Sequence, residues 1–92
     1  MSPSRMDVIV GQDPEEATGF VLGSPAVGHF SSPPRVGEVV VGGSTVGGLK
    51  SLGRRIDLVG PRGVTGRVAE IESGTRDGPV GYGQNLLRLV PV

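Results

Sequence analysis

The sequence predicts an all-β fold, a flattened antiparallel β-sandwich or β-barrel of about eight short strands. Its 92 residues include seventeen glycines and eight prolines, and because both residue types interrupt helices, a helix bundle is excluded. From residue 19 onward, valine-rich apolar runs of three to five residues alternate with turn residues. This pattern is typical of short strands joined by tight turns.

The expected elements divide the chain into a leader, residues 1–18, and one domain, residues 19–92. The leader is acidic, and its apolar run at 6–10 predicts either an extra edge strand or a partly disordered segment. Within the domain, the SSPPR segment at 31–35 must be a loop, because consecutive prolines cannot donate hydrogen bonds to a sheet. The eight expected strands lie in the segments FVL, AVGHF, VGEVVV, GLKSL, IDLV, GRVAEIE, PVGY and LLRLV.

Two of these segments also predict local packing. In RVAEI, the alternation places Val68 and, past a kink, Ile71 toward the core, whereas Arg67 and Glu70 face water. In VVVGGSTVGG, glycines inside a strand predict bulges or the close approach of another segment.

Composition and charge exclude several classes of function. The formal charge sums to zero, but the first 17 residues hold four acidic residues and one arginine, so the rest carries eight basic and five acidic groups. Such a small cationic excess, with two phenylalanines and one tyrosine to stack on bases, argues against nucleic-acid binding. The chain has no cysteine and one histidine, so we expect neither disulfides nor a metal site. The termini show no apolar run of signal-peptide or membrane length, so we expect a cytoplasmic protein without a membrane partner.

Four segments, in order, resemble the biotin carboxyl carrier family of biotinyl/lipoyl attachment domains. SPAVGHF at 24–30 is similar to the family's S-P-M-V-G-T-F, and GRVAEI at 66–71 to its G-T-V-K-E-I. PVGYGQNLLRLVP at 79–91 is similar to P-V-E-Y-G-Q-P-L-F-V-I-E-P. VGEVVVGGSTVGGLKSLGRR at 36–55 lies without a gap on V-G-D-x-V-x-x-G-Q-x-L-x-x-I-E-A-M-K-M-M. The resemblance implies a flattened barrel of two four-stranded antiparallel sheets with quasi-twofold symmetry.

The resemblance also implies an exposed hairpin tip with a modified lysine, and here that position is Gly53. A biotin or lipoyl amide needs an ε-amine, so carrier function by this chemistry is excluded in this register, and we expect no cofactor. A slip of three residues would bring Lys50, the one lysine, to the turn, but a slip of odd length would also turn the strand's inward residues outward. Glycine at the tip otherwise fits a turn that needs positive φ.

The candidate site residues surround this tip or lie in the segments that resemble the family. Arg54, Arg55 and Lys50 are candidate ligand-binding residues, since two arginines at a turn can reach one carboxylate or phosphate; solvated charges that block sheet aggregation are the alternative. His29 is a candidate general acid or base, oriented by an acidic neighbour such as Asp57 or Glu38.

Two further candidates have simple structural alternatives. Tyr82 is a third catalytic candidate, although its GYGQ segment also matches a structural turn of the family. Asp57 itself also fits the outward position of an alternating strand.

Two functions of different classes follow. In the first, the domain has become a small enzyme of bacterial secondary metabolism that isomerises, cyclises, hydrates or dehydrates a polyketide-like small molecule. Because so small a sandwich has little room for a ligand pocket, this function goes together with a homodimer. In the second, it is a non-catalytic docking or accessory module for a carboxylase, a synthase or an acyl carrier protein. Acyl carriers are commonly acidic and would suit the paired arginines.

Overall fold

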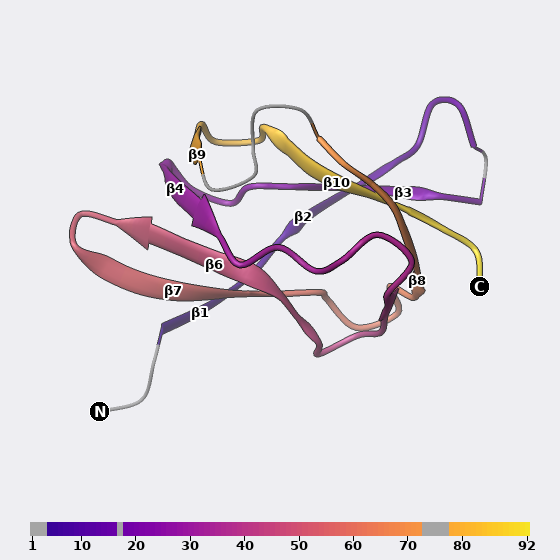
Figure 1. Ribbon diagram of the computed structural model, residues 1–92, viewed down its shortest axis with the longest axis horizontal. Helices are drawn as coiled ribbons and strands as arrows, with labels where there is room; N and C mark the ends of the chain where they lie inside the picture. The colour runs from indigo at the N-terminus through magenta and orange to yellow at the C-terminus, as the bar shows by residue number, and fades with distance from the viewer. Residues whose placement is uncertain (1–3, 17, 73–77) are drawn as a thin grey trace.

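The computed structural model describes residues 4–16, 18–72 and 78–92, and over these residues the chain forms strands and no helix. The expected all-β class is therefore confirmed. Each of the eight segments expected to be strands overlaps one observed strand, and the leader adds two more (Figure 1). The strands are β1 (Ser4–Asp7), β2 (Ile9–Gln12), β3 (Phe20–Gly23), β4 (Gly28–Ser31), β5 (Val39–Val40), β6 (Thr45–Ser51), β7 (Arg54–Val59), β8 (Gly66–Ile71), β9 (Gly78–Val80) and β10 (Asn85–Val90).

The strands form two five-stranded sheets. Sheet A has the order β1-β7-β6-β4-β9, and sheet B the order β2-β3-β10-β8-β5. All pairings are antiparallel except that of β1 with β7, which is parallel. Among the described strands no pairing closes the two sheets into a barrel, so of the two expected architectures the barrel is not formed.

One hydrophobic core lies between the sheets. Phe30 and Leu49 contribute to it from sheet A, and Leu22, Val68 and Leu89 from sheet B. All five side chains are at most 1% exposed. The alternation expected in β8 holds, since Val68 is buried while its neighbour Arg67 is exposed.

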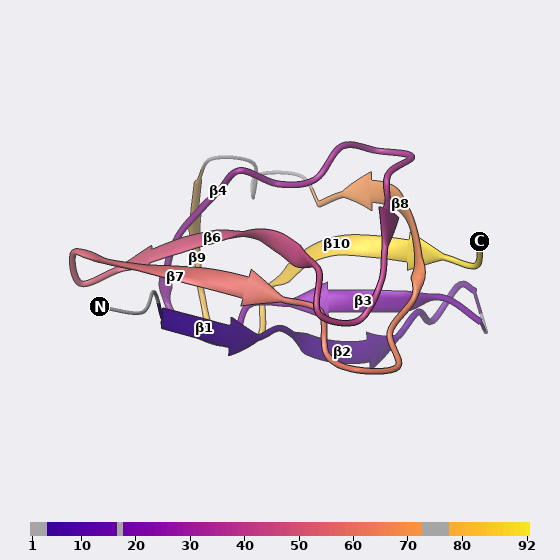
Figure 2. The same ribbon diagram turned by 90° about the horizontal axis from the view of Figure 1, so that it is seen from below.

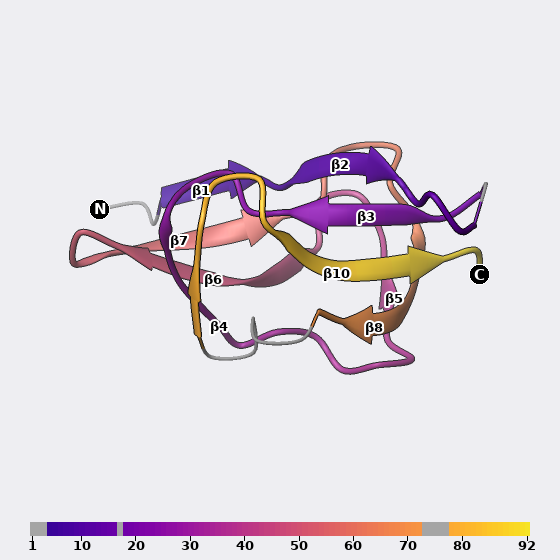
Figure 3. The same ribbon diagram turned by 90° about the horizontal axis from the view of Figure 1, so that it is seen from above.

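The leader joins the edges of the two sheets. β1 pairs with β7 at the edge of sheet A, and β2 pairs with β3 at the edge of sheet B (Figure 3). Between them, Val8 is 4% exposed, belongs to the core, and donates its backbone N–H to the Val59 carbonyl at 3.0 Å. The apolar run at 6–10 therefore lies in β1, β2 and the residue between them, at the edges of the two sheets.

Strands β6 and β7 form a hairpin arm that extends beyond the strands of sheet B (Figures 1 and 2). Ser51 pairs with Arg54, so the turn consists of Leu52 and Gly53 alone, with φ angles of 51° and 78°. Two positive φ angles are the signature of a type I′ turn, which suits the twist of a hairpin. Gly53 therefore lies at the tip, and Lys50 pairs with Arg55 inside the ladder rather than at the turn.

Gly47, inside β6, lies where the strand has a bulge and where the Phe30 ring leaves no room for a side chain. The β6–β7 register shifts between Thr45 and Gly47, as the glycine pattern predicts for a bulge. Gly47 has a φ of 136°, and a Cβ atom added to it would lie 2.6 Å from Cε1 of Phe30. The missing side chain lets the Phe30 ring fill the core against the backbone.

The described part of the chain contains no helix with the length and hydrophobicity that a membrane span requires.

Candidate functional site

The candidate site lies on the outer face of sheet A, opposite the core. Phe30 and Leu49 pair across β4 and β6 and point inward, so their strand neighbours His29 and Lys50 point outward. Cross-strand pairing then forms one row from Pro79 through His29 and Lys50 to Arg55. Three of the candidate residues, from three different strands, are therefore neighbours on one surface.

A second row on the same face runs beside the first. It consists of Ser31, Gly48, Asp57 and Arg5, on β4, β6, β7 and β1. Asp57 is half-buried and forms an ion pair with Arg55, whose Nε lies 3.5 Å from its Oδ1. Arg5 is the register partner of Asp57 on β1, so Asp57 has an arginine as a neighbour both along its own strand and across to β1.

Gly48 provides the space that Arg55 occupies. A Cβ atom at Gly48 would lie 2.8 Å from Nη2 and 3.0 Å from Cζ of Arg55. The guanidinium group therefore lies over the bare backbone of β6 at Gly48, beside the Asp57 carboxylate. This part of the face holds two carboxylates, those of Asp57 and Asp7, against three cations, those of Arg5, Lys50 and Arg55, so its net charge is positive. We call these three residues the cationic face.

Arg54 belongs to the opposite face of the arm. It pairs with Ser51, and its Nη2 donates to Oγ of Ser4 at 3.3 Å. Because Arg54 remains within the ladder rather than in the turn, the two neighbouring arginines point to opposite faces. The contact of both with one anion, which the sequence suggested, is not available in this geometry.

Within residues 4–16, 18–72 and 78–92, His29 forms no contact with a carboxylate. His29 is exposed on β4, and the described residues give its ring no hydrogen-bond partner. Asp57 lies on β7 with β6 between them, two strand spacings across and two residues along, about 12 Å away. Glu38 precedes β5, a strand of sheet B.

Tyr82 lies apart from the other candidates. It is 73% exposed in the turn between β9 and β10. Gln84 stabilises this turn, because its side-chain oxygen accepts the N–H of Gly81 at 2.9 Å. This position agrees with a structural role in the turn, which is the alternative to a catalytic role for Tyr82.

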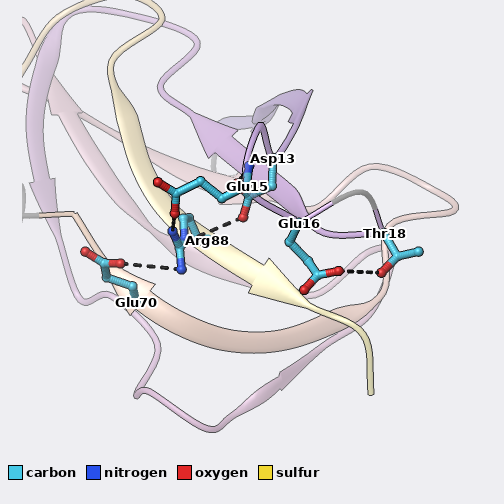
Figure 4. Close-up of polar contacts among 6 residues, drawn as sticks. All are labelled: Asp13, Glu15, Glu16, Thr18, Glu70 and Arg88. Atoms are coloured by element: carbon cyan, nitrogen blue, oxygen red, sulfur yellow. Dashed lines mark hydrogen bonds and ion pairs between the residues drawn. The ribbon is translucent and has the colours of Figure 1, made fainter.

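A charged cluster that the sequence did not predict lies on the outer face of sheet B (Figure 4). Arg88 on β10 forms ion pairs with three carboxylates, at 3.6 Å to Asp13, 3.2 Å to Glu15 and 3.7 Å to Glu70. The Asp13 side chain is 1% exposed, and its Oδ1 accepts the backbone N–H of Glu15 at 2.9 Å. The cluster ties the acidic loop of the leader to β10 and β8. The one signal for it was a lone arginine inside the apolar run LLRLV.

Among the described residues, no group of three or more histidine, aspartate or glutamate side chains is arranged to hold a metal ion.

Comparison with known proteins finds no family model that matches the chain and no curated protein with a matching sequence. The arrangement of side chains on the two faces of sheet A therefore carries the functional argument.

Proposed function

We propose that this protein is a carrier-like domain of the biotinyl/lipoyl type that has lost its attachment lysine and acts as a docking module for an acidic protein partner. The partner class that fits best is an acyl carrier protein. The single observation that carries the proposal is the cationic face on a projecting hairpin arm whose tip residue is Gly53.

The strand order supports the carrier-like architecture. Without the leader strands, sheet A is β7-β6-β4-β9 and sheet B is β3-β10-β8-β5. If the domain strands from β3 to β10 are numbered one to eight, these orders become 5-4-2-7 and 1-8-6-3. Adding four to each number in the order of sheet B, and counting on from one again after eight, gives the order of sheet A. This relation between the two strand orders supports the quasi-twofold symmetry that the family resemblance implies.

The position of Gly53 supports the loss of the attachment chemistry. It lies at the tip of the most projecting hairpin, where the resemblance places the modified lysine (Figure 2). A Cβ atom there would meet no atom within 4 Å, so the tip has room for a displayed side chain. Glycine supplies no amine at this point, and Lys50 lies three residues away within the ladder.

The cationic face supports docking to an acidic partner. Arg5, Lys50 and Arg55 are exposed on an open sheet, where charges accelerate association and select the partner by its sign. An open, cationic sheet face suits the convex acidic surface of a protein better than it suits a small substrate, which binds in concave sites.

The test is a titration of the protein with an acidic acyl carrier protein at low and high salt. We expect binding that weakens with salt and that falls by more than about tenfold in the variant Lys50→Glu/Arg55→Glu. The control variant Arg35→Glu/Arg62→Glu changes the net charge equally, at exposed loop positions. If both variants bind equally weakly, or if the wild type does not bind, the cationic face is not a docking site.

The small enzyme of secondary metabolism is the second candidate. The observation that favours it is the pairing of His29 with Lys50, which would let a polyketide-like substrate contact a proton-transfer group and a cation together. It is the weaker candidate because, among the described residues, no carboxylate is in hydrogen-bond contact with His29. Turnover of a pathway intermediate that His29→Ala abolishes, with the fold intact, would favour it over docking.

A further inference from the structure

The reverse face of the hairpin arm carries an apolar groove that the fold leaves open. Strand alternation puts Ser51, Arg54 and Ile56 on the core-side face of sheet A, beside Ser4 and Met6 of β1. The arm extends past the strands of sheet B, so this part of the face has no opposing sheet (Figures 1 and 2). The result is a hollow of about 340 Å³, lined by Ser4, Met6, Ser51, Leu52, Arg54 and Ile56.

The lining combines an aliphatic floor with one cation. Met6 is 37% exposed, Leu52 is fully exposed, and Ile56 is partly buried, so three apolar side chains face water at one place. Arg54 is the one charged residue of this lining. Its hydrogen bond to Ser4 Oγ uses one of five guanidinium donors and holds the group beside the apolar side chains.

We propose that this groove binds an aliphatic carboxylate, with the alkyl chain on Met6, Leu52 and Ile56 and the carboxylate on Arg54. A guanidinium group suits a carboxylate because two parallel N–H groups can donate to its two oxygens. A water molecule or a methylene group takes about 30 Å³, so a hollow of about 340 Å³ has room for a ligand of about ten non-hydrogen atoms. Octanoate has this size.

Charge argues against a second copy of the chain as the occupant. A symmetric dimer formed through this groove would bring the same patch of both copies together and place one Arg54 near the other. Two like charges at the centre of a small apolar contact oppose association. An anion with an aliphatic chain would pair with Arg54 and cover the apolar side chains of the groove.

The site is independent of the proposed docking function, because it lies on the other face of the arm. The variants of Arg54 test the groove, and those of Lys50 and Arg55 test the cationic face. Either proposal can therefore fail while the other holds.

The experiment is a titration of the ¹⁵N-labelled full chain with octanoate, followed by amide chemical shifts. We expect saturable shifts confined to residues 4–6 and 51–56. Acetate, which lacks the chain, and octanol, which lacks the charge, should each bind at least about tenfold more weakly.

Substitutions at the groove sharpen this test. Arg54→Gln should weaken octanoate binding about tenfold and Leu52→Asn should also weaken it, whereas Arg55→Gln, on the opposite face, should leave it unchanged. The spectrum of each variant shows whether its fold is intact. The proposal is overturned if acetate or octanol matches octanoate, if Arg54→Gln binds as the wild type does, or if Arg55→Gln weakens binding as much as Arg54→Gln.

Discussion

The substitution Gly47→Ala tests whether the core is packed as described. Gly47 has a φ of 136°, which L-residues rarely adopt, and we assign about 1 to 3 kcal/mol to this strain. Its new Cβ would lie 2.6 Å and 2.9 Å from two ring atoms of Phe30, a side chain with no exposure to solvent. Displacing a buried ring in this way costs about 1 to 3 kcal/mol more.

We therefore expect Gly47→Ala to lower the free energy of unfolding by at least about 2 kcal/mol. This is a large part of the roughly 5 to 14 kcal/mol expected for a domain of this length. Urea unfolding followed by circular dichroism measures the change.

Two other glycines serve as controls. Gly53→Ala, with φ of 78° but open space, should cost about 1 kcal/mol. Gly81→Ala, whose new Cβ would meet no atom closer than Oε1 of Gln84 at 3.9 Å, should stay within about 0.5 kcal/mol. The packing described around Phe30 is refuted if Gly47→Ala is no more destabilising than Gly53→Ala.

Two further predictions concern the leader. Val8→Ala should destabilise the protein by about 2 kcal/mol in urea unfolding, because two buried methyl groups between the sheets are lost; an unchanged midpoint would show that the leader is not part of the core. Arg88→Met should cost about 2 kcal/mol or more, since it leaves the buried Asp13 carboxylate without its cation. Adding Asp13→Asn should restore part of that loss in a double-mutant cycle, and strict additivity of the two substitutions would exclude the coupling.

Much of the fold could be predicted because its signals are local. Alternating apolar residues and turn glycines located the eight domain strands, and proline chemistry predicted the loop at 31–35 except for its first residue, since Ser31 ends β4. The turn at Gly53 could be predicted for the same reason, since positive φ at a hairpin tip favours glycine.

The contacts of the leader could not be predicted, because they join residues far apart in the sequence. Glu15 and Arg88 are 73 positions apart, and no local pattern in the acidic loop indicates a partner on the last strand. Val8 looked like one residue in a short apolar run, and its burial depends on where the edges of both sheets meet.

The candidate site could be predicted in part. Strand alternation predicts opposite directions for Arg54 and Arg55 if both belong to the strand, whereas in a turn both could contact one anion. Because the turn has only two residues, both arginines pair within the β6–β7 ladder, and they point to opposite faces. The neighbours of His29 depend on the β4–β6 register, which the sequence does not specify. That register places Lys50, and not Asp57, opposite the histidine.

The claim on which the account depends is that the arm has the architecture of a carrier tip without its amine. Its most direct test is the intact mass of the protein after incubation with biotin protein ligase, ATP and biotin. We expect the wild type to remain unmodified, and the variant Leu52→Met/Gly53→Lys/Arg54→Met, which restores the family's tip residues, to gain one biotinyl group. A biotinyl group on the wild-type chain, or none on the restored tip of a folded variant, would contradict the account.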